Sequence, residues 1–139
     1  MRVEPHLCFE GRCEEALEFY RRALGAEVQI MMRFRDMPGP SSAGGAPPGC
    51  ENKVMHATIR IGDTKTMASD GNCTGKPDFK GIDLALQVRD LIAAERLFTA
   101  LAEGGQVRIP LAKTFWSPGF AMVTDRFGVG WMINVESEG

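Results

Sequence analysis

Few side chains in this sequence could do chemistry. Its two histidines, His6 and His56, fall in segments whose composition indicates β-strands, and His56 belongs to the polar face of its strand. His56 would there either line a cavity or stay half-exposed. Asp83 interrupts an otherwise apolar segment, and a carboxylate buried there would need a partner. It could bind a metal ion or pair with Arg60 or Arg33, and we favour the ion pair.

Three aromatic side chains near the C-terminus could form the wall of an apolar ligand pocket: Trp116, Phe120 and Trp131. They lie in and beside a predicted β-hairpin with strands at 120–124 and 129–135. Large aromatic residues beside a hairpin more often pack in a core. Core packing is therefore the competing interpretation for all three.

Two aspartates stand next to turns. Asp70 ends a predicted strand before a glycine-rich loop, where it could be either a turn cap or a site residue. Asp125 opens the tight turn Asp-Arg-Phe-Gly, in which Gly128 can supply a positive φ. We expect a structural role for Asp125.

Composition and spacing argue against several classes of function. The 16 basic and 18 acidic residues leave a formal charge of −2, so a nucleic-acid-binding surface is not indicated. No Ser-His-Asp or Cys-His arrangement follows from spacing, and there is no phosphate-binding loop. No strand is followed by the glycine fingerprint of a cofactor-binding α/β fold, which disfavours a methyltransferase.

The cysteines and the N-terminus indicate a cytoplasmic protein. None of the cysteines forms a C-x-x-C pair, so neither a zinc knuckle nor a redox motif is supported; they are Cys8, Cys13, Cys50 and Cys73. The first residues include an acid and a proline where a signal peptide needs an apolar stretch. No apolar run approaches the roughly 18 residues of a membrane-spanning helix. We expect reduced thiols, a cytoplasmic location, and no membrane or nucleic-acid partner.

The elements that must position these side chains follow from periodicity and chain breakers. In the first half, strands are predicted at 3–10, 27–35, 53–61 and 65–70, with a helix over 12–24. In the second half, we expect a strand over 82–88, a helix over 91–102, a strand over 106–109, a loop over 110–119 and the hairpin. Gly25 should close the first helix, and Asp90 should cap the second.

The strand over 27–35 and the segment after it make a further prediction. Alternation places four apolar residues on one face of that strand: Val28, Ile30, Met32 and Phe34. Residues 36–52 are too rich in Gly and Pro to continue a helix or a sheet. That loop is either a lid over a pocket or a simple excursion.

The order of elements repeats. A strand, a helix and then three strands occur twice, with a period near eighty residues. Each set would expose one apolar sheet face, so neither set should be stable alone. The repeat predicts an α+β fold of two βαβββ modules in one domain over 1–139, the first at about 3–71 and the second at about 81–136.

With the repeat established, the segments LCFEG, EEALEFYRRALGAEV, HATIRIGDT, MASD, FTALAEGGQV and TFWSPGFAMVTDRFGVGWMIN can be compared with known families. Together they resemble the PhnB-like branch of the vicinal oxygen chelate (glyoxalase/bleomycin resistance/dioxygenase) superfamily. Some members carry the label demethylubiquinone methyltransferase-like. The resemblance implies tandem βαβββ modules whose sheets curl into an incomplete mixed barrel around a cavity, and a homodimer.

The resemblance also implies a divalent metal ion, held in the cavity by residues of the first and last strands of each module. The matching positions are His6 and either Met67 or Ser69 in the first module, and Asp83, or Ile82 in a shifted register, in the second. In the last strand the position falls on Met132, a poor ligand for a hard cation, and Glu136 is a nearby oxygen donor. The metal set implied is therefore His6, Asp83, Ser69 and Glu136.

Two functions follow from the resemblance. The first is a protein that binds a small molecule in the cavity without a complete metal site, as drug-sequestering members of the superfamily do. The second is a metal-dependent lyase, isomerase or dioxygenase that acts on a substrate with adjacent oxygens. The sparse His and Glu inventory favours the first. The residues expected to contact the ligand are His56, Arg33, Asp70, Trp116, Phe120 and Trp131.

Overall fold

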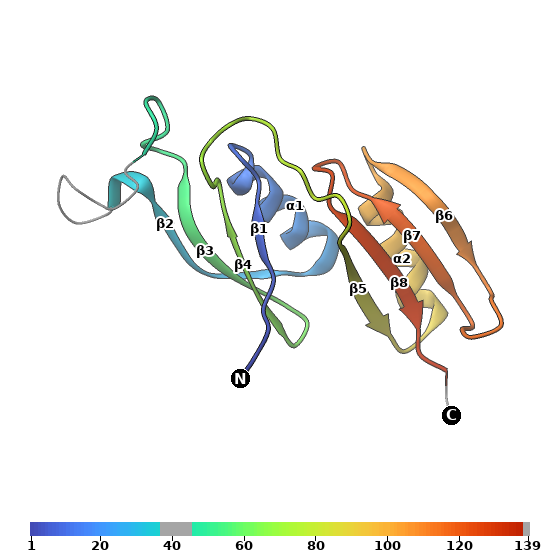
Figure 1. The fold of residues 1–139 in the computed structure, drawn as a ribbon. Helices are drawn as coiled ribbons and strands as arrows, with labels where there is room; N and C mark the ends of the chain where they lie inside the picture. The colour runs from blue at the N-terminus through green and yellow to red at the C-terminus, as the bar shows by residue number, and fades with distance from the viewer. Residues whose placement is uncertain (37–45, 138–139) are drawn as a thin grey trace. The chain divides into compact units, whose positions relative to one another are not determined.

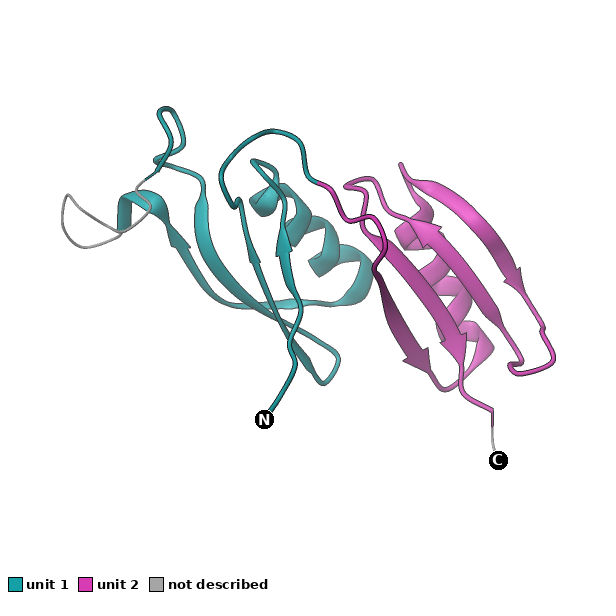
Figure 2. Cartoon of the chain, viewed as in Figure 1, with its two compact units in different colours: residues 1–77 teal, residues 78–139 magenta. Residues whose placement is uncertain are grey.

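The computed structural model describes residues 1–36 and 46–137, and they form two compact units, Met1–Pro77 and Asp78–Gly139 (Figure 2). Each unit is a βαβββ module with one four-stranded sheet and one long helix (Figure 1). The predicted α+β class with a repeated module is confirmed. Among the described residues, neither helix has the length and apolar character needed to cross a bilayer.

The first unit has the sheet order β1-β4-β3-β2. Its β1 and β4 run parallel, and the other neighbours are antiparallel. Its elements are β1 (His6–Cys8), α1 (Cys13–Leu24), β2 (Glu27–Arg33), the 3-10 turn η1 (Phe34–Asp36), β3 (Val54–Ile61) and β4 (Thr64–Ser69).

The second unit repeats this order as β5-β8-β7-β6, with β5 and β8 parallel. Its elements are β5 (Asp83–Val88), α2 (Leu91–Ala102), β6 (Gln106–Ala112), β7 (Phe120–Thr124) and β8 (Gly130–Val135).

The ends of both helices form as their sequences predict. Gly25 takes a left-handed conformation, and its N–H donates to the Arg21 carbonyl. Asp90 caps α2, because its Oδ1 accepts from the Ala93 N–H at 2.7 Å. Both predictions are confirmed.

Three strand predictions need correction, and the first two concern the bounds of β1 and β6. β1 covers only three residues and not 3–10. β6 continues through Pro110 to Ala112, where a loop was expected. It can do so because it is an edge strand, where a missing N–H costs no ladder hydrogen bond.

The alternation expected for β2 is also wrong. The register with β3 shifts between Val28 and Ile30 and again between Met32 and Arg33. Each irregularity changes which residues share a face. Val28 is paired with Ile59 and Ile30 with Thr58, so Val28 and Ile30 lie on opposite faces, and both are exposed on this edge strand. Most of the 36–52 loop, residues 37–45, lies outside the described residues.

The turn between β7 and β8 is organised by one buried carboxylate. Asp125 Oδ1 accepts from the backbone N–H groups of Phe127 and Val129 at 2.8 and 3.1 Å. Its Oδ2 accepts from the Trp131 indole N–H at 2.9 Å. The expected structural role of Asp125 is confirmed by these contacts.

Replacing this carboxylate should destabilise the second unit. Asp125→Ala leaves three buried donors without an acceptor, and we expect the free energy of unfolding to fall by about 3 kcal/mol. Asp125→Asn keeps one carbonyl oxygen and should cost distinctly less. Urea unfolding followed by tryptophan fluorescence measures both. Equal losses in the two variants, or a negligible loss in Asp125→Ala, would contradict the role given to Asp125.

Candidate functional site

The first sheet gathers polar side chains on one face, which we call its helix-free face. Apolar residues of the strands pack on the other face with α1; among them Leu7 and Ala68 are buried side by side. The helix-free face carries the alternate residues. His6 and Ser69 lie there on the parallel strands β1 and β4, and His56 and Thr58 lie there on β3.

These four side chains contact each other in two pairs. The His6 Nε2 atom lies 3.1 Å from the Ser69 hydroxyl, and the His56 Nε2 atom lies 3.3 Å from the Thr58 hydroxyl. Ser69 and Thr58 are both buried. The predicted residues His6, Ser69 and His56 therefore share one face, whereas Thr58 was missed because its type alone carries no signal.

The environment of His6 favours its neutral form. Burial, and then the charge of neighbouring His56, lower the pKa of His6 below its ordinary value of 6.5. A neutral imidazole keeps one ring nitrogen as an acceptor, and that nitrogen can take a hydrogen bond, take a proton or bind a metal ion. The site can therefore do acceptor chemistry near neutral pH.

The second sheet has an equivalent helix-free face, and one end of it holds an ion pair. Asp83 Oδ1 lies 2.7 Å from Arg108 Nη2, which also reaches the Val123 carbonyl at 3.1 Å. The carboxylate lies against Gly130, where an added Cβ would come within 2.1 Å of Asp83 Oδ1. The predicted ion pair exists, but its partner is Arg108 on β6, so both expected partners were wrong.

The aromatic residues divide between core and surface. Trp131 is only 1% exposed and donates to the Asp125 carboxylate. It therefore packs in the core, as the competing interpretation expected. Trp116 is 49% exposed and stacks edge-on against Phe120, with ring centroids 5.3 Å apart. Phe115 is 96% exposed beside Trp116, although no sequence pattern had singled it out.

Asp70 performs the structural role of a cap. Its Oδ1 accepts from the N–H groups of Gly11 and Cys13, and its Oδ2 accepts from Val54 N–H, each at 2.8 Å. These bonds fix the start of α1, whose N-cap residue Arg12 makes no side-chain cap. The turn-cap alternative for Asp70 is the one observed.

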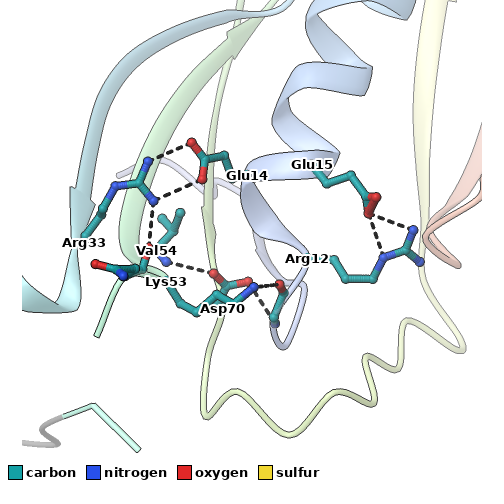
Figure 3. A pocket seen from close by; sticks show the side chains of 9 residues that line it. Arg12, Glu14, Glu15, Arg33, Lys53, Val54 and Asp70 are labelled. Carbon is teal, nitrogen blue, oxygen red and sulfur yellow. Dashed lines mark hydrogen bonds and ion pairs between the residues drawn. The ribbon is translucent and has the colours of Figure 1, made fainter. Parts of the chain in front are cut away.

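Asp70 also borders a cavity of about 470 Å³ near the start of α1 (Figure 3). There Arg33 binds both Glu14 carboxylate oxygens, at 3.0 and 2.7 Å, and its hydrogen bond lowers the pKa of Glu14. Lys53 Nζ donates to the Gly11 carbonyl at 2.8 Å. The cations of this cavity therefore already have partners in the protein.

Neither unit by itself supplies a full set of metal ligands. Within residues 1–36 and 46–137, no group of three or more His, Cys, Asp or Glu side chains is placed to hold a metal ion. His6 and Ser69 are together in the first unit. In the second unit Asp83 is paired with Arg108, and Glu136 is exposed one residue beyond β8. The donor side chains described in each unit are therefore too few to form a metal site within that unit.

The chain is similar to several known proteins over nearly its whole length. The family model described as 3-demethylubiquinone-9 3-methyltransferase matches residues 1–134. Protein YjdN of Escherichia coli (strain K12) is 38% identical over 140 residues, which cover 97% of this chain and 95% of that protein.

Solved structures agree with this similarity. Protein PA1353 from Pseudomonas aeruginosa is 41% identical with a TM-score of 0.85, over 99% of both chains. A putative 3-demethylubiquinone-9 3-methyltransferase, PhnB protein, from Bacillus cereus is 25% identical with a TM-score of 0.77, over 97% of this chain and 99% of that one. A glyoxylase/bleomycin resistance protein/dioxygenase domain from Frankia sp. EAN1pec shares the fold, with 14% identity and a TM-score of 0.68 over 100% and 93% of the chains.

The two imidazoles make a testable prediction about pH. Because the folded protein has the lower pKa, the stability that His6 contributes is complete above pH 6.5 and is lost as pH falls through the folded pKa. We expect the NMR titration midpoint of His6 to lie below 6.5. His56→Asn should raise it only in part, since burial remains.

Asp63→Asn, in the exposed turn between β3 and β4, is the control and should leave the His6 midpoint unchanged. A midpoint at or above 6.5, or one that ignores His56→Asn, would contradict the assigned causes.

Proposed function

We propose that this chain, which belongs to the 3-demethylubiquinone-9 3-methyltransferase family and to the PhnB-like branch of the vicinal oxygen chelate superfamily, binds a small molecule on the helix-free face of its first sheet. The family model carries the name of a methyl transfer. In the described residues, however, no strand leads into a helix through the glycine-rich turn that cofactor-binding α/β sheets use.

One observation carries the proposal: a few convergent polar groups sit among apolar side chains on the first helix-free face. His6, Ser69, His56 and Thr58 supply the polar atoms, and Met67 lies between them in register with both His6 and Thr58. Small-molecule sites have this composition, in which apolar contacts give affinity and a few polar groups fix orientation.

The second sheet offers a separate aromatic surface on its own helix-free face. Trp116 presents half of its surface, and Phe120 lies beneath it. A flat, polarisable surface of this kind binds apolar or aromatic groups with little loss of side-chain entropy. Of the ligand contacts expected from the sequence, we retain His56 on the first face, and Trp116 and Phe120 on the second.

A metal-dependent enzyme is the second candidate, and the lowered pKa of His6 supports it, because a metal ligand must be a neutral imidazole. His6 and Ser69 would hold the ion in the first unit; Asp83 and Glu136, the other ligands implied by the family resemblance, belong to the second unit. The ion would act as a Lewis acid toward adjacent substrate oxygens. Asp83 would have to leave Arg108 to take part.

Metal analysis of protein purified without chelator separates the two candidates. For the binding protein we expect well under one equivalent of divalent metal in the wild type, in His6→Asn and in the control Asp63→Asn. One equivalent of metal in the wild type and in Asp63→Asn, with none in His6→Asn, would establish the metal-dependent alternative and refute the metal-free form of the proposal.

Ligand binding itself can be tested by thermal shift with a panel of small apolar and zwitterionic compounds. A compound that binds only the native state raises the melting temperature. We expect a hit whose affinity falls about tenfold in His56→Asn, the loss of one or two hydrogen bonds. Asp63→Asn should bind it as the wild type does. An equal loss in both variants, or no hit in the panel, would count against binding at this face.

A further inference from the structure

The aromatic surface of the second helix-free face, which the proposed function leaves without a defined ligand, belongs to a longer strip of side chains. Gln87, Asn134 and Phe120 are direct neighbours across β5, β8 and β7, since Asn134 is in register with both of the others. Trp116 extends the strip over Phe120, and Phe115 stacks edge-on against Trp116 with centroids 4.8 Å apart. The two amides therefore adjoin Phe120, and the rings of Trp116 and Phe115 continue the strip beyond it.

One atom of this strip is buried without a partner. Asn134 Nδ2 donates to Gln87 Oε1 at 2.9 Å, which orients the Asn134 amide. Its Oδ1 atom is buried, and no donor among the described residues reaches it. A buried acceptor left without a hydrogen bond is costly, and such groups in native proteins call for an explanation. A ligand that brings a hydrogen-bond donor would remove that cost.

The aromatic loop beside this acceptor is held in place. Thr114 N–H donates to the Ser117 carbonyl at 2.9 Å, and Ser117 N–H donates to Thr114 Oγ1 at 3.0 Å. The buried Ser117 hydroxyl lies 2.8 Å from the carbonyl oxygens of both Gly119 and Val135. The loop thus presents two exposed aromatic rings from a hydrogen-bonded base, which lowers the entropy lost when they bind a partner.

We propose that this strip recognises a small, uncharged aromatic molecule that carries a hydroxyl or N–H donor. Its ring would contact Trp116 and Phe115, and its donor would bond to Asn134 Oδ1, which a shift of a neighbouring side chain must first open because that atom is buried. The inference rests on the proposed small-molecule binding and names the class of ligand. An anionic ring is disfavoured, because the carboxylate of Glu136 follows two residues after Asn134.

Three probes test the two parts of this recognition: phenol, acetophenone and cyclohexanol. Phenol has the ring and the donor, acetophenone has the ring and only an acceptor, and cyclohexanol has the donor without the ring. Binding to the full ¹⁵N-labelled chain is followed by NMR at the indole N–H of Trp116 and the side-chain amide of Asn134. The buried indole N–H of Trp131, bonded to Asp125, is the internal reference.

We expect phenol to move the Trp116 and Asn134 signals and to leave Trp131 unchanged. Its affinity should exceed that of acetophenone by about tenfold, the worth of one good hydrogen bond, and cyclohexanol should not saturate. In Asn134→Leu the two aromatic probes should bind equally, and Trp116→Leu should weaken both. The control Ile92→Ala, at an 80% exposed position on α2, should change nothing.

Several results would overturn the inference. Acetophenone binding as well as phenol would reject Asn134 Oδ1 as the selecting acceptor. If the Trp116 signals shift with protein concentration but not with added phenol, the aromatic loop would instead be a contact surface between two copies of this chain. If a hit of the thermal-shift panel responds to His56→Asn while phenol leaves Trp116 unmoved, this inference fails and the proposed function stands.

Discussion

Each unit depends on one buried aspartate whose carboxylate accepts three hydrogen bonds. Asp70 joins the start of α1 to the start of β3 through Gly11, Cys13 and Val54, which lie far from it in sequence. Asp125 fixes the β7–β8 turn. A carboxylate excluded from water is tolerated only when such donors surround it. The same bonds hold the neighbouring strands in register, and register decides which side chains share a face.

The chemistry of each unit follows from its parallel strand pair. In the first unit, β1 and β4 set Cys8 opposite Ser69, and that register brings His6 within hydrogen-bond distance of the Ser69 hydroxyl. In the second unit, β5 and β8 set Asp83 opposite Gly130, where the absent side chain leaves room for the carboxylate and its arginine. The repeated backbone therefore carries different chemistry in its two copies: imidazole and hydroxyl in one, an ion pair and amides in the other.

The repeat, both helices and the hairpins could be predicted from sequence, because period and glycine position act locally. The family similarity confirmed the PhnB-like assignment. Long-range pairing was less accessible. Asp83 was expected to need a cation, yet its partner Arg108 could be found only once β6 was placed beside β7 and β8. The faces of the β2 residues depended on register shifts that periodicity does not encode, and the unsatisfied oxygen of Asn134 could be found only from its side-chain contact with Gln87.

The charges on the two helix-free faces bear on what they can bind. The environment of His6 disfavours its charged form, and Asp83 forms an ion pair with Arg108, with Oδ1 2.7 Å from Nη2. Asn134 and Trp116 add polar and aromatic surface without charge. An ionic ligand would lose its hydration at these four groups without gaining an unpaired opposite charge from any of them, and that loss costs more than an uncharged hydrogen bond returns. A neutral ligand has no such penalty there, so these groups favour a neutral molecule with a few hydrogen-bonding groups.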